Sequence, residues 1–159
     1  MAEYTSRSFD LLTLGQLLLR LSPPDNDRLS RGDTFVKQVG GAELNVAVGA
    51  SLLGLRTGVI SKLPSHDIGS FMKGKIRSFG VSDDFFMYDD SPSARVGIYY
   101  YENGAYPRKP KVIYDRMNSS FFSLNIDEIP KEVYTASKCF HTTGITLALS
   151  PQIRETTIE

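Results

Sequence analysis

The chain is 159 residues long, with 41% hydrophobic and 23% charged residues, which is the size and composition of one ordinary folded domain. Its 18 Lys and Arg residues are balanced by 18 Asp and Glu residues, so it lacks the basic excess typical of proteins that bind nucleic acids or anionic membranes. With no long apolar run and no secretion-signal pattern at its start, it is expected in the cytoplasm, where the single Cys139 forms no intrachain disulfide and packs in the core.

The first half of the sequence alternates between strand and helix patterns. Residues 9–21 (FDLLTLGQLLLRL) have the apolar character of a buried strand, broken near Gly15, and residues 34–39 form a short strand. Residues 42–53 follow as a helix that ends at Gly54 and is covered on two sides, because its apolar residues form a wide stripe. That stripe consists of Leu44, Ala47, Val48, Ala50, Leu52 and Leu53.

A strand at residues 57–63 and a second helix continue this alternation. The helix is expected to be capped by Ser65 or Asp67 and to end at Gly80, because apolar residues recur at helical spacing between them. Strands that alternate with helices are typical of a parallel sheet with helices packed against it, so the predicted fold class is α/β.

The middle of the chain changes character. Residues 94–101 (ARVGIYYY) and 111–116 (KVIYDR) are rich in β-branched and aromatic residues, which predicts an antiparallel strand pair with a long connection. A short helix at residues 127–136, a strand at 138–143 and a helix opened by Ser150-Pro151 restore the alternation. Because little sequence remains for that last helix, we expect the chain to be the front portion of a larger protein.

The segment before the first helix could contact a ligand. Gly40 and Gly41 leave the backbone bare, and Asn45, one turn inside the helix, can both donate and accept hydrogen bonds. Together with the free amides of the helix start, these residues suit a polyhydroxylated molecule. The alternative is a tight turn in which Asn45 bonds to neighbouring backbone groups.

The aromatic strands hold a second candidate group. Tyr99 and Tyr101 share one face of their strand, and Tyr114 and Arg116 share a face of the facing strand. An arginine beside two phenols could bind a carboxylate through its planar guanidinium. The alternative is a surface sheet in which the tyrosines pack and the arginine is solvated.

Other common sites are excluded by their missing motifs. The sequence contains no G-x-x-x-x-G-K-[ST] phosphate loop, and no G-x-G-x-x-G follows the first strand. His66 and His141 stand alone, without a second His or Cys at ligand spacing, so we expect no metal site.

Residues 40–69, GGAELNVAVGASLLGLRTGVISKLPSHDIG, resemble the first signature of the ribokinase-like (pfkB) carbohydrate kinases, most closely that of the 2-keto-3-deoxygluconate kinases. Shorter matching pieces extend the resemblance over nearly the whole chain: FDLLTLGQLLLRL, GVSDDF, GIYY, VIYDR and FHTTGITLALSP. The resemblance covers only about the first half of a family member of typical domain size.

This resemblance implies a ribokinase-like parallel sheet flanked by helices, with a small β-sheet lid and with the C-terminal half missing. Residues 1–159 would then be the N-terminal part of a carbohydrate kinase domain, with lid strands at about residues 35–39, 94–101 and 111–116. In relatives the lid often forms the dimer contact, so a homodimer through the lid is expected. The family also implies that the acidic sugar is contacted or bordered by Gly40, Gly41, Asn45, Tyr99, Tyr114 and Arg116.

Two departures from the family pattern matter. Gln16 stands where relatives commonly carry an acidic residue, so this expected substrate-binding position keeps its hydrogen-bonding capacity but loses a charge. The second family signature, a glycine-rich G-A-G-D element that supplies the anion hole and the catalytic base, is absent from the sequence. We therefore expect no catalytic residue in this chain.

The resemblance implies that the full-length protein moves the γ-phosphate of ATP, with Mg²⁺, to a hydroxyl of a small sugar acid such as 2-keto-3-deoxygluconate. The chain alone is expected to bind that sugar weakly, to hold neither ATP nor Mg²⁺, and to be inactive. One alternative is a non-catalytic half-domain for sugar binding or dimerisation. Another is a kinase whose substrate is a neutral hexose or ribose. Contacts with nucleic acid or membrane are not expected.

Overall fold

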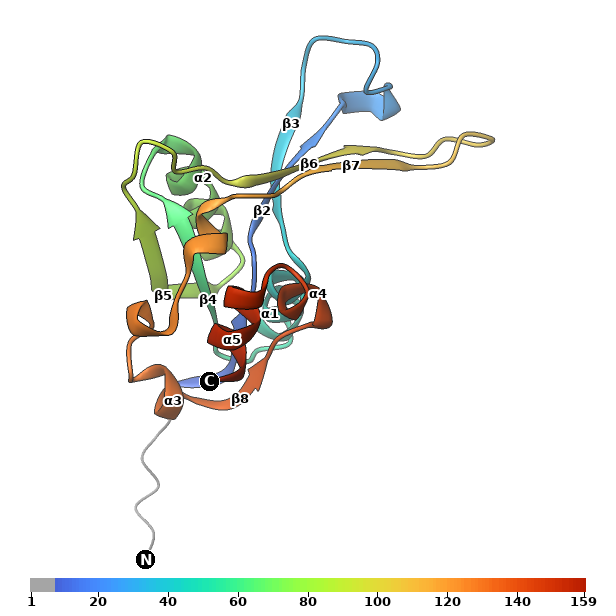
Figure 1. Cartoon of the computed structure of the whole chain (residues 1–159). Helices are drawn as coiled ribbons and strands as arrows, with labels where there is room; N and C mark the ends of the chain where they lie inside the picture. Colours follow the sequence, from blue (N-terminus) through green and yellow to red (C-terminus); the bar gives the residue numbers. More distant parts are fainter. Residues whose placement is uncertain (1–7) are drawn as a thin grey trace, which may run out of the picture.

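A four-stranded parallel sheet forms the body of the protein, in the order β5-β4-β1-β8 (Figure 1). The computed structural model describes residues 8–159. Residues 1–7, on which the prediction of no secretion signal mainly rests, lie outside the described residues. The body strands are β1 (Phe9–Leu14), β4 (Thr57–Pro64), β5 (Val81–Asp89) and β8 (Ser137–His141). The parallel α/β sheet predicted from the alternating pattern is confirmed.

Helices and short turns cover both faces of the body sheet. One face packs against α1 (Ala42–Leu52) and α2 (Asp67–Ser78) through a core that includes Leu44, Val59 and Met72. The other face carries a second core around Leu12, Phe121 and Ile153. The elements after the lid are the 3₁₀ turns η2 (Ser120–Ser123) and η3 (Ile126–Glu128), and the helices α3 (Val133–Ala136), α4 (Gly144–Leu147) and α5 (Pro151–Ile158).

A second four-stranded sheet, which we call the lid, extends away from the body in the order β3-β2-β6-β7 (Figure 1). Its strands are β2 (Leu18–Ser22), β3 (Val36–Gly40), β6 (Gly97–Glu102) and β7 (Lys111–Asp115), and the short 3₁₀ helix η1 (Pro24–Asn26) lies between β2 and β3. β2 and β6 are parallel, whereas the two outer pairs are antiparallel. The second small sheet expected from the family resemblance is therefore present.

Residues 9–21 do not form one interrupted strand, as the sequence suggested. The chain leaves the body sheet after Leu14 and enters the lid at Leu18, so the break at Gly15 is a passage between two sheets. The apolar residues on both sides of Gly15 are buried in different cores, which explains why their pattern looked continuous.

Two elements were missed by the sequence patterns. β5 (VSDDFFMYD) was missed because its acidic residues hide its apolar character, although buried Asp83 pairs with Arg77 at 2.6 Å and with Lys73 at 3.2 Å, both on α2. The short α4 was also missed. The expected helix at 127–136 is instead η3 followed by the four-residue α3.

Three local predictions were wrong. Helix α2 is capped by His66, whose Nδ1 accepts from the Ile68 amide at 3.2 Å, and not by Ser65 or Asp67. Cys139 is exposed because β8 pairs only with β1 and forms an edge of the sheet. Helix α1 is not covered on two sides, since Leu52 is 75% exposed.

A buried carboxylate fixes the start of α1 to the body. Glu43 is 2% exposed, and its Oε1 accepts hydrogen bonds from the Thr143 amide (3.2 Å), the Thr143 hydroxyl (2.5 Å) and the Thr146 hydroxyl (2.7 Å). The same carboxylate lies against Gly15, where a Cβ would collide with it. Glu43 therefore joins α1, the end of β1 and the turn before α4 at one point.

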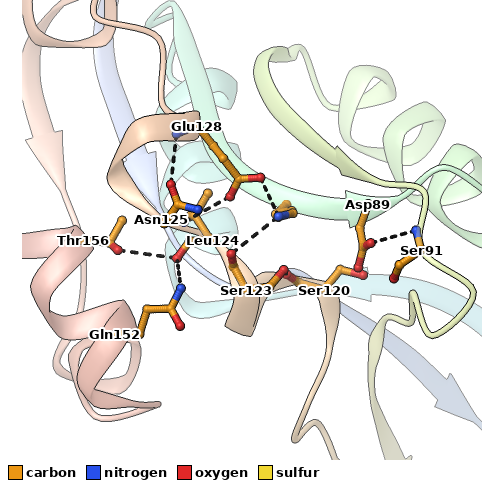
Figure 2. A network of polar contacts seen from close by, with 10 residues as sticks. Asp89, Ser91, Ser120, Ser123, Leu124, Asn125, Glu128, Gln152 and Thr156 are labelled. Atoms are coloured by element: carbon orange, nitrogen blue, oxygen red, sulfur yellow. Dashed lines mark hydrogen bonds and ion pairs between the residues drawn. The ribbon is translucent and has the colours of Figure 1, made fainter.

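The segment that follows the lid is anchored by a network of polar contacts (Figure 2). Lys62 of β4 donates to Glu128 Oε1 at 2.6 Å, and Glu128 and Asn125 exchange backbone-to-side-chain hydrogen bonds. The carbonyl of Leu124 accepts from Gln152 at 3.2 Å and from Thr156 at 3.4 Å, both on α5. These contacts hold the return from β7 to the body in one conformation.

In the described part of the chain, no helix combines the length and apolarity that a membrane crossing requires.

Replacing Glu43 with Ala tests the buried carboxylate. The change leaves the Thr143 amide and two threonine hydroxyls without their acceptor, so the free energy of unfolding should fall by about 2–4 kcal/mol. Urea denaturation followed by circular dichroism measures this loss. Glu155→Ala, an exposed position on α5, is the control and should change stability by less than about 0.5 kcal/mol. Equal stability of the two variants would contradict the role given to Glu43.

Candidate functional site

The candidate site lies where the lid joins the body. Gln16 is in the passage from β1 to β2, Gly40 ends β3, and Gly41 is the N-cap residue of α1. Tyr99 lies on β6, while Tyr114 lies on β7 and Arg116 directly follows that strand. The structure brings all of these predicted residues together through direct contacts, although they come from six separate elements or connections.

The two glycines are required by the close approach of neighbouring groups. A Cβ on Gly40 would lie 2.5 Å from the Tyr99 hydroxyl oxygen. A Cβ on Gly41 would lie 2.8 Å from the Gln16 carbonyl oxygen, and Gly41 has a φ of +153°, which other residues rarely adopt. The bare backbone predicted from the sequence therefore has a structural cause in addition to any contact with a ligand.

Arg116 is held by Gln16. Its Nε donates to Gln16 Oε1 at 2.8 Å, and Gln16 Nε2 donates to the Arg116 carbonyl at 3.1 Å and to Ser119 Oγ at 2.7 Å. Gln16 and Ser119 are 2% and 4% exposed, so this arrangement is shielded from water. The residue that carries the positive charge is thus oriented by a neutral partner.

Tyrosines extend the site along the lid. Tyr99 and Tyr114 are directly opposite each other, with ring centroids 5.9 Å apart, and the Arg116 guanidinium carbon lies 5.8 Å from the Tyr114 ring centroid. Burial raises the pKa of the Tyr99 phenol above its ordinary value, so this hydroxyl stays protonated and can donate a hydrogen bond at neutral pH. Further out on the same face, the Arg20 guanidinium carbon lies 4.3 Å from the Tyr101 ring centroid.

Arg116 gives the site a positive charge that is not paired directly with any carboxylate of the described residues. Burial lowers the pKa of the Arg116 guanidinium, although Tyr114 and Glu43 act in the opposite direction, and an arginine so perturbed is still charged at neutral pH. Within residues 8–159, no Asp or Glu oxygen lies within ion-pair distance of Arg116. The alternative of a fully solvated surface arginine does not fit, because Arg116 is half-buried and bonded to Gln16.

Asn45 contacts the other predicted site residues only through its backbone. It lies in the first turns of α1, where its backbone N–H donates to the Gly41 carbonyl at 2.9 Å, and the residue is exposed. Its side chain makes no hydrogen bond to any described residue, so the alternative in which it bonds to neighbouring backbone groups is not observed. Asn45 therefore remains available to an external partner.

Three residues of this region escaped the sequence analysis as parts of the site. Ser119 orients Gln16, Arg20 stacks on Tyr101, and Gly97 leaves room beside Gln16, since a Cβ there would lie 2.9 Å from Gln16 Nε2. Nothing in the local pattern marks Ser119 or Gly97. Arg20 carried a detectable signal, because it interrupts the apolar run from Leu17 to Leu21.

A separate cavity lies elsewhere in the described structure and is not lined by these residues. A cavity of about 340 Å³ opens on the face of the body sheet that α5 covers, and its lining includes Leu14, Ile60, Ile129 and Phe140. No group of three or more His, Cys, Asp or Glu side chains among the described residues is arranged to hold a metal ion.

Comparison with known proteins identifies relatives over nearly the whole chain. The model of the pfkB family carbohydrate kinases matches residues 8–159. A 2-dehydro-3-deoxygalactonokinase from Haloferax volcanii is 39% identical over 150 residues, which cover 94% of this chain and 46% of that protein. A 5-dehydro-2-deoxygluconokinase from Listeria innocua is 29% identical over the same share of both chains. The chain thus spans about half the length of the curated relatives that it matches.

Solved structures agree with this result. The crystal structure of a 2-dehydro-3-deoxygluconokinase from Thermotoga maritima superimposes with a TM-score of 0.88 at 34% identity, covering 94% of this chain and 45% of that one. A sugar kinase from Pyrococcus horikoshii in complex with ATP has a TM-score of 0.80 at 24% identity, which supports the fold alone. With its family model matched from residue 8 to residue 159, the chain belongs to the pfkB family of carbohydrate kinases, as its signature indicated.

Proposed function

We propose that the whole protein is a cytoplasmic kinase that transfers the γ-phosphate of ATP, with Mg²⁺, to a hydroxyl of a small sugar acid such as 2-keto-3-deoxygluconate. The observation that carries this proposal is the half-buried Arg116 guanidinium, which is held in place by a neutral amide and lacks a carboxylate partner in the described chain. The names of the Haloferax and Thermotoga relatives, which designate kinases of dehydro-deoxy sugar acids, support the same substrate class.

Each site residue has a role in this proposal. Arg116 pairs with the sugar carboxylate, because a guanidinium binds both oxygens of a carboxylate at once. The Tyr99 and Tyr114 hydroxyls donate to or accept from the sugar hydroxyls. Asn45 and the unobstructed backbone at Gly40 and Gly41 border the sugar from the side of the body.

We infer that Mg²⁺ and ATP are bound by another part of the whole protein and not by residues 8–159. The described part of the chain has no cluster of acidic, His or Cys side chains suited to a metal, and the sequence has neither a phosphate loop nor the G-A-G-D signature. We therefore assign nucleotide binding and the catalytic base to a part of the protein that this sequence does not contain. The role of the chain is to bind and orient the sugar.

The isolated chain should not turn over substrate. Phosphoryl transfer depends on groups that position the phosphate and stabilise its charge, and without them almost no rate is left. A coupled assay of ADP formation, with purified chain, ATP, Mg²⁺ and 2-keto-3-deoxygluconate, should give the rate of the enzyme-free control. Turnover that disappears in an Arg116→Ala variant would show that the chain is catalytic by itself.

Replacing Arg116 with Ala tests the substrate class. The affinity for 2-keto-3-deoxygluconate should fall by about 10-fold or more, because the change removes a charge-assisted hydrogen bond worth about 1.5–3 kcal/mol. Binding of a neutral hexose should change little, and calorimetric titration measures both affinities. Arg31→Ala removes the same charge from an exposed loop residue and is the control. Equal losses for acid and neutral sugar would favour the neutral hexose or ribose substrate.

We also propose that the lid mediates a homodimer. Four apolar side chains on the lid and at its edge are between 42% and 48% exposed, namely Phe35, Val36, Val112 and Ile113. They lie on or beside β3 and β7, the two outer strands of a thin sheet that extends from the body, so the lid offers exposed apolar surface for contact with a second copy.

Sedimentation velocity tests the lid contact. The unmodified chain should sediment as a dimer at concentrations of about 10–100 μM, and Ile113→Asp should shift it to monomer, because the change buries a charge in the interface. Tyr134→Asp is the matched control, since Tyr134 is 60% exposed but lies on α3, away from the lid. A dimer lost in Tyr134→Asp and kept in Ile113→Asp would place the interface on the body.

A further inference from the structure

We propose that Arg20 is a positioning residue of the sugar site, which holds the Tyr99 phenol from the neighbouring strand so that the Tyr99 hydroxyl donates its proton to the sugar. The inference rests on the proposed function, in which Tyr99 contacts the sugar. It goes further by fixing the direction of one hydrogen bond and by giving Arg20 a role in the site.

The Arg20 and Tyr99 side chains are neighbours on one face of the lid. In the parallel pairing of β2 with β6, Arg20 lies opposite Tyr99, and in the antiparallel pairing of β6 with β7, Tyr99 lies opposite Tyr114. Residues that are opposite each other on paired strands point to the same face of a sheet. The three side chains therefore form one row across the lid, with the cation at one end and the two phenols beside it.

The guanidinium of Arg20 is held by two other contacts. Its Nε donates to Ser22 Oγ at 2.9 Å, and its central carbon lies 4.3 Å from the Tyr101 ring centroid. These contacts occupy Nε and one face of the guanidinium plane, so the terminal N–H groups are left for another acceptor. Arg20 is half-buried, and within residues 8–159 no Asp or Glu oxygen lies within ion-pair distance of it.

The Tyr99 oxygen is the acceptor beside these N–H groups. Burial raises the pKa of the Tyr99 phenol, and the charge of Arg20 and a hydrogen bond from its side chain act in the opposite direction. A guanidinium can only donate, so the Tyr99 oxygen accepts in this hydrogen bond. The phenol proton must then be given to a different group.

That proton is left for a ligand in the sugar site. The Tyr99 hydroxyl oxygen lies so close to Gly40 that a Cβ there would be 2.5 Å from it, and no described residue accepts the phenol proton. Because its oxygen accepts from a cation, the phenol becomes a stronger donor toward a sugar oxygen. Without Arg20 the hydroxyl could accept as readily as donate, so the sugar would lose a donor of fixed direction.

A double-mutant cycle tests the inference, with calorimetric titration of the 159-residue chain by 2-keto-3-deoxygluconate. Tyr99→Phe and Arg20→Met should each weaken binding by about 3–10-fold, because each removes part of the same hydrogen-bonded pair. When Tyr99 is already Phe, Arg20→Met should cause less than about a 2-fold further loss, since the group through which it acts is gone.

Two matched controls separate this role from a structural one. In a Tyr114→Phe background, Arg20→Met should still cause its full loss, because Tyr114 lies in the same row but does not contact Arg20 directly. Arg31→Met removes the same charge from an exposed loop residue and should leave the affinity within about 2-fold. A general weakening of the lid would not distinguish between the two tyrosine backgrounds.

The outcomes separate this inference from the proposed function. If the unmodified chain fails to bind the acid, the proposed function fails and the inference fails with it. If the chain binds the acid, the inference alone is overturned when Arg20→Met has no effect, or when its loss is as large with Phe at position 99 as with Tyr. If Arg20→Met does not fold by thermal melting, Arg20→Gln, which also removes the charge, decides on the same criteria.

Discussion

The candidate site depends on a steric constraint where the lid meets the body: the backbone at Gly40 and Gly41 passes so close to Tyr99 and to the Gln16 carbonyl that no side chain fits between them. This contact joins the end of β3, the start of α1, strand β6 and the passage between the two sheets. A larger residue at either glycine would push the lid away from the body. The same displacement would separate Tyr99 from the residues that follow β1.

The position of Arg116 follows from that junction. The residue lies after the last lid strand, where the chain returns to the body, and its hydrogen bonds to Gln16 connect that return to the passage between β1 and β2. The return itself is fixed further along by the contacts of Lys62 and Glu128 and by the bonds from α5 to the Leu124 carbonyl. Anchors on both sides of Arg116 thus limit its movement, which lowers the entropic cost of binding a ligand.

The sequence was informative where local pattern determines structure and uninformative where distant segments meet. The apolar runs of β1 and β4 and the periodicity of α2 predicted the parallel body, because burial on both faces leaves a clear pattern. The sequence did not separate strand β2 from β1. An apolar run indicates that its residues are buried, but it does not indicate which of the two cores buries them. Strand β5 was missed because Asp83 is paired with Lys73 and Arg77 of α2, and the sequence of the strand alone does not show these ion pairs.

The site shows the same division between local and distant information. Gly40, Gly41, Tyr99, Tyr114 and Arg116 were found from residue type and family resemblance, and the structure brings them together. The bond between Gln16 and Arg116 joins residues 100 positions apart, and no local pattern predicts such a contact. Family comparison marked Gln16 as a departure in charge, but its meaning required the geometry, which shows an amide between a donor and an acceptor.

Charge at this junction is arranged so that the protein does not cancel it. Glu43, the acidic residue whose field reaches Arg116, is buried, and its Oε1 takes its hydrogen bonds from an amide and two hydroxyls, all of them neutral. Gln16, in direct contact with Arg116, is neutral as well. The negative charge is thus stabilised by neutral dipoles inside the body, and the positive charge stays half-exposed at the lid. The guanidinium thus keeps a neutral amide as its direct partner, while the Glu43 carboxylate acts on it only from a distance. A positive charge without a carboxylate in direct contact can still attract an anionic ligand.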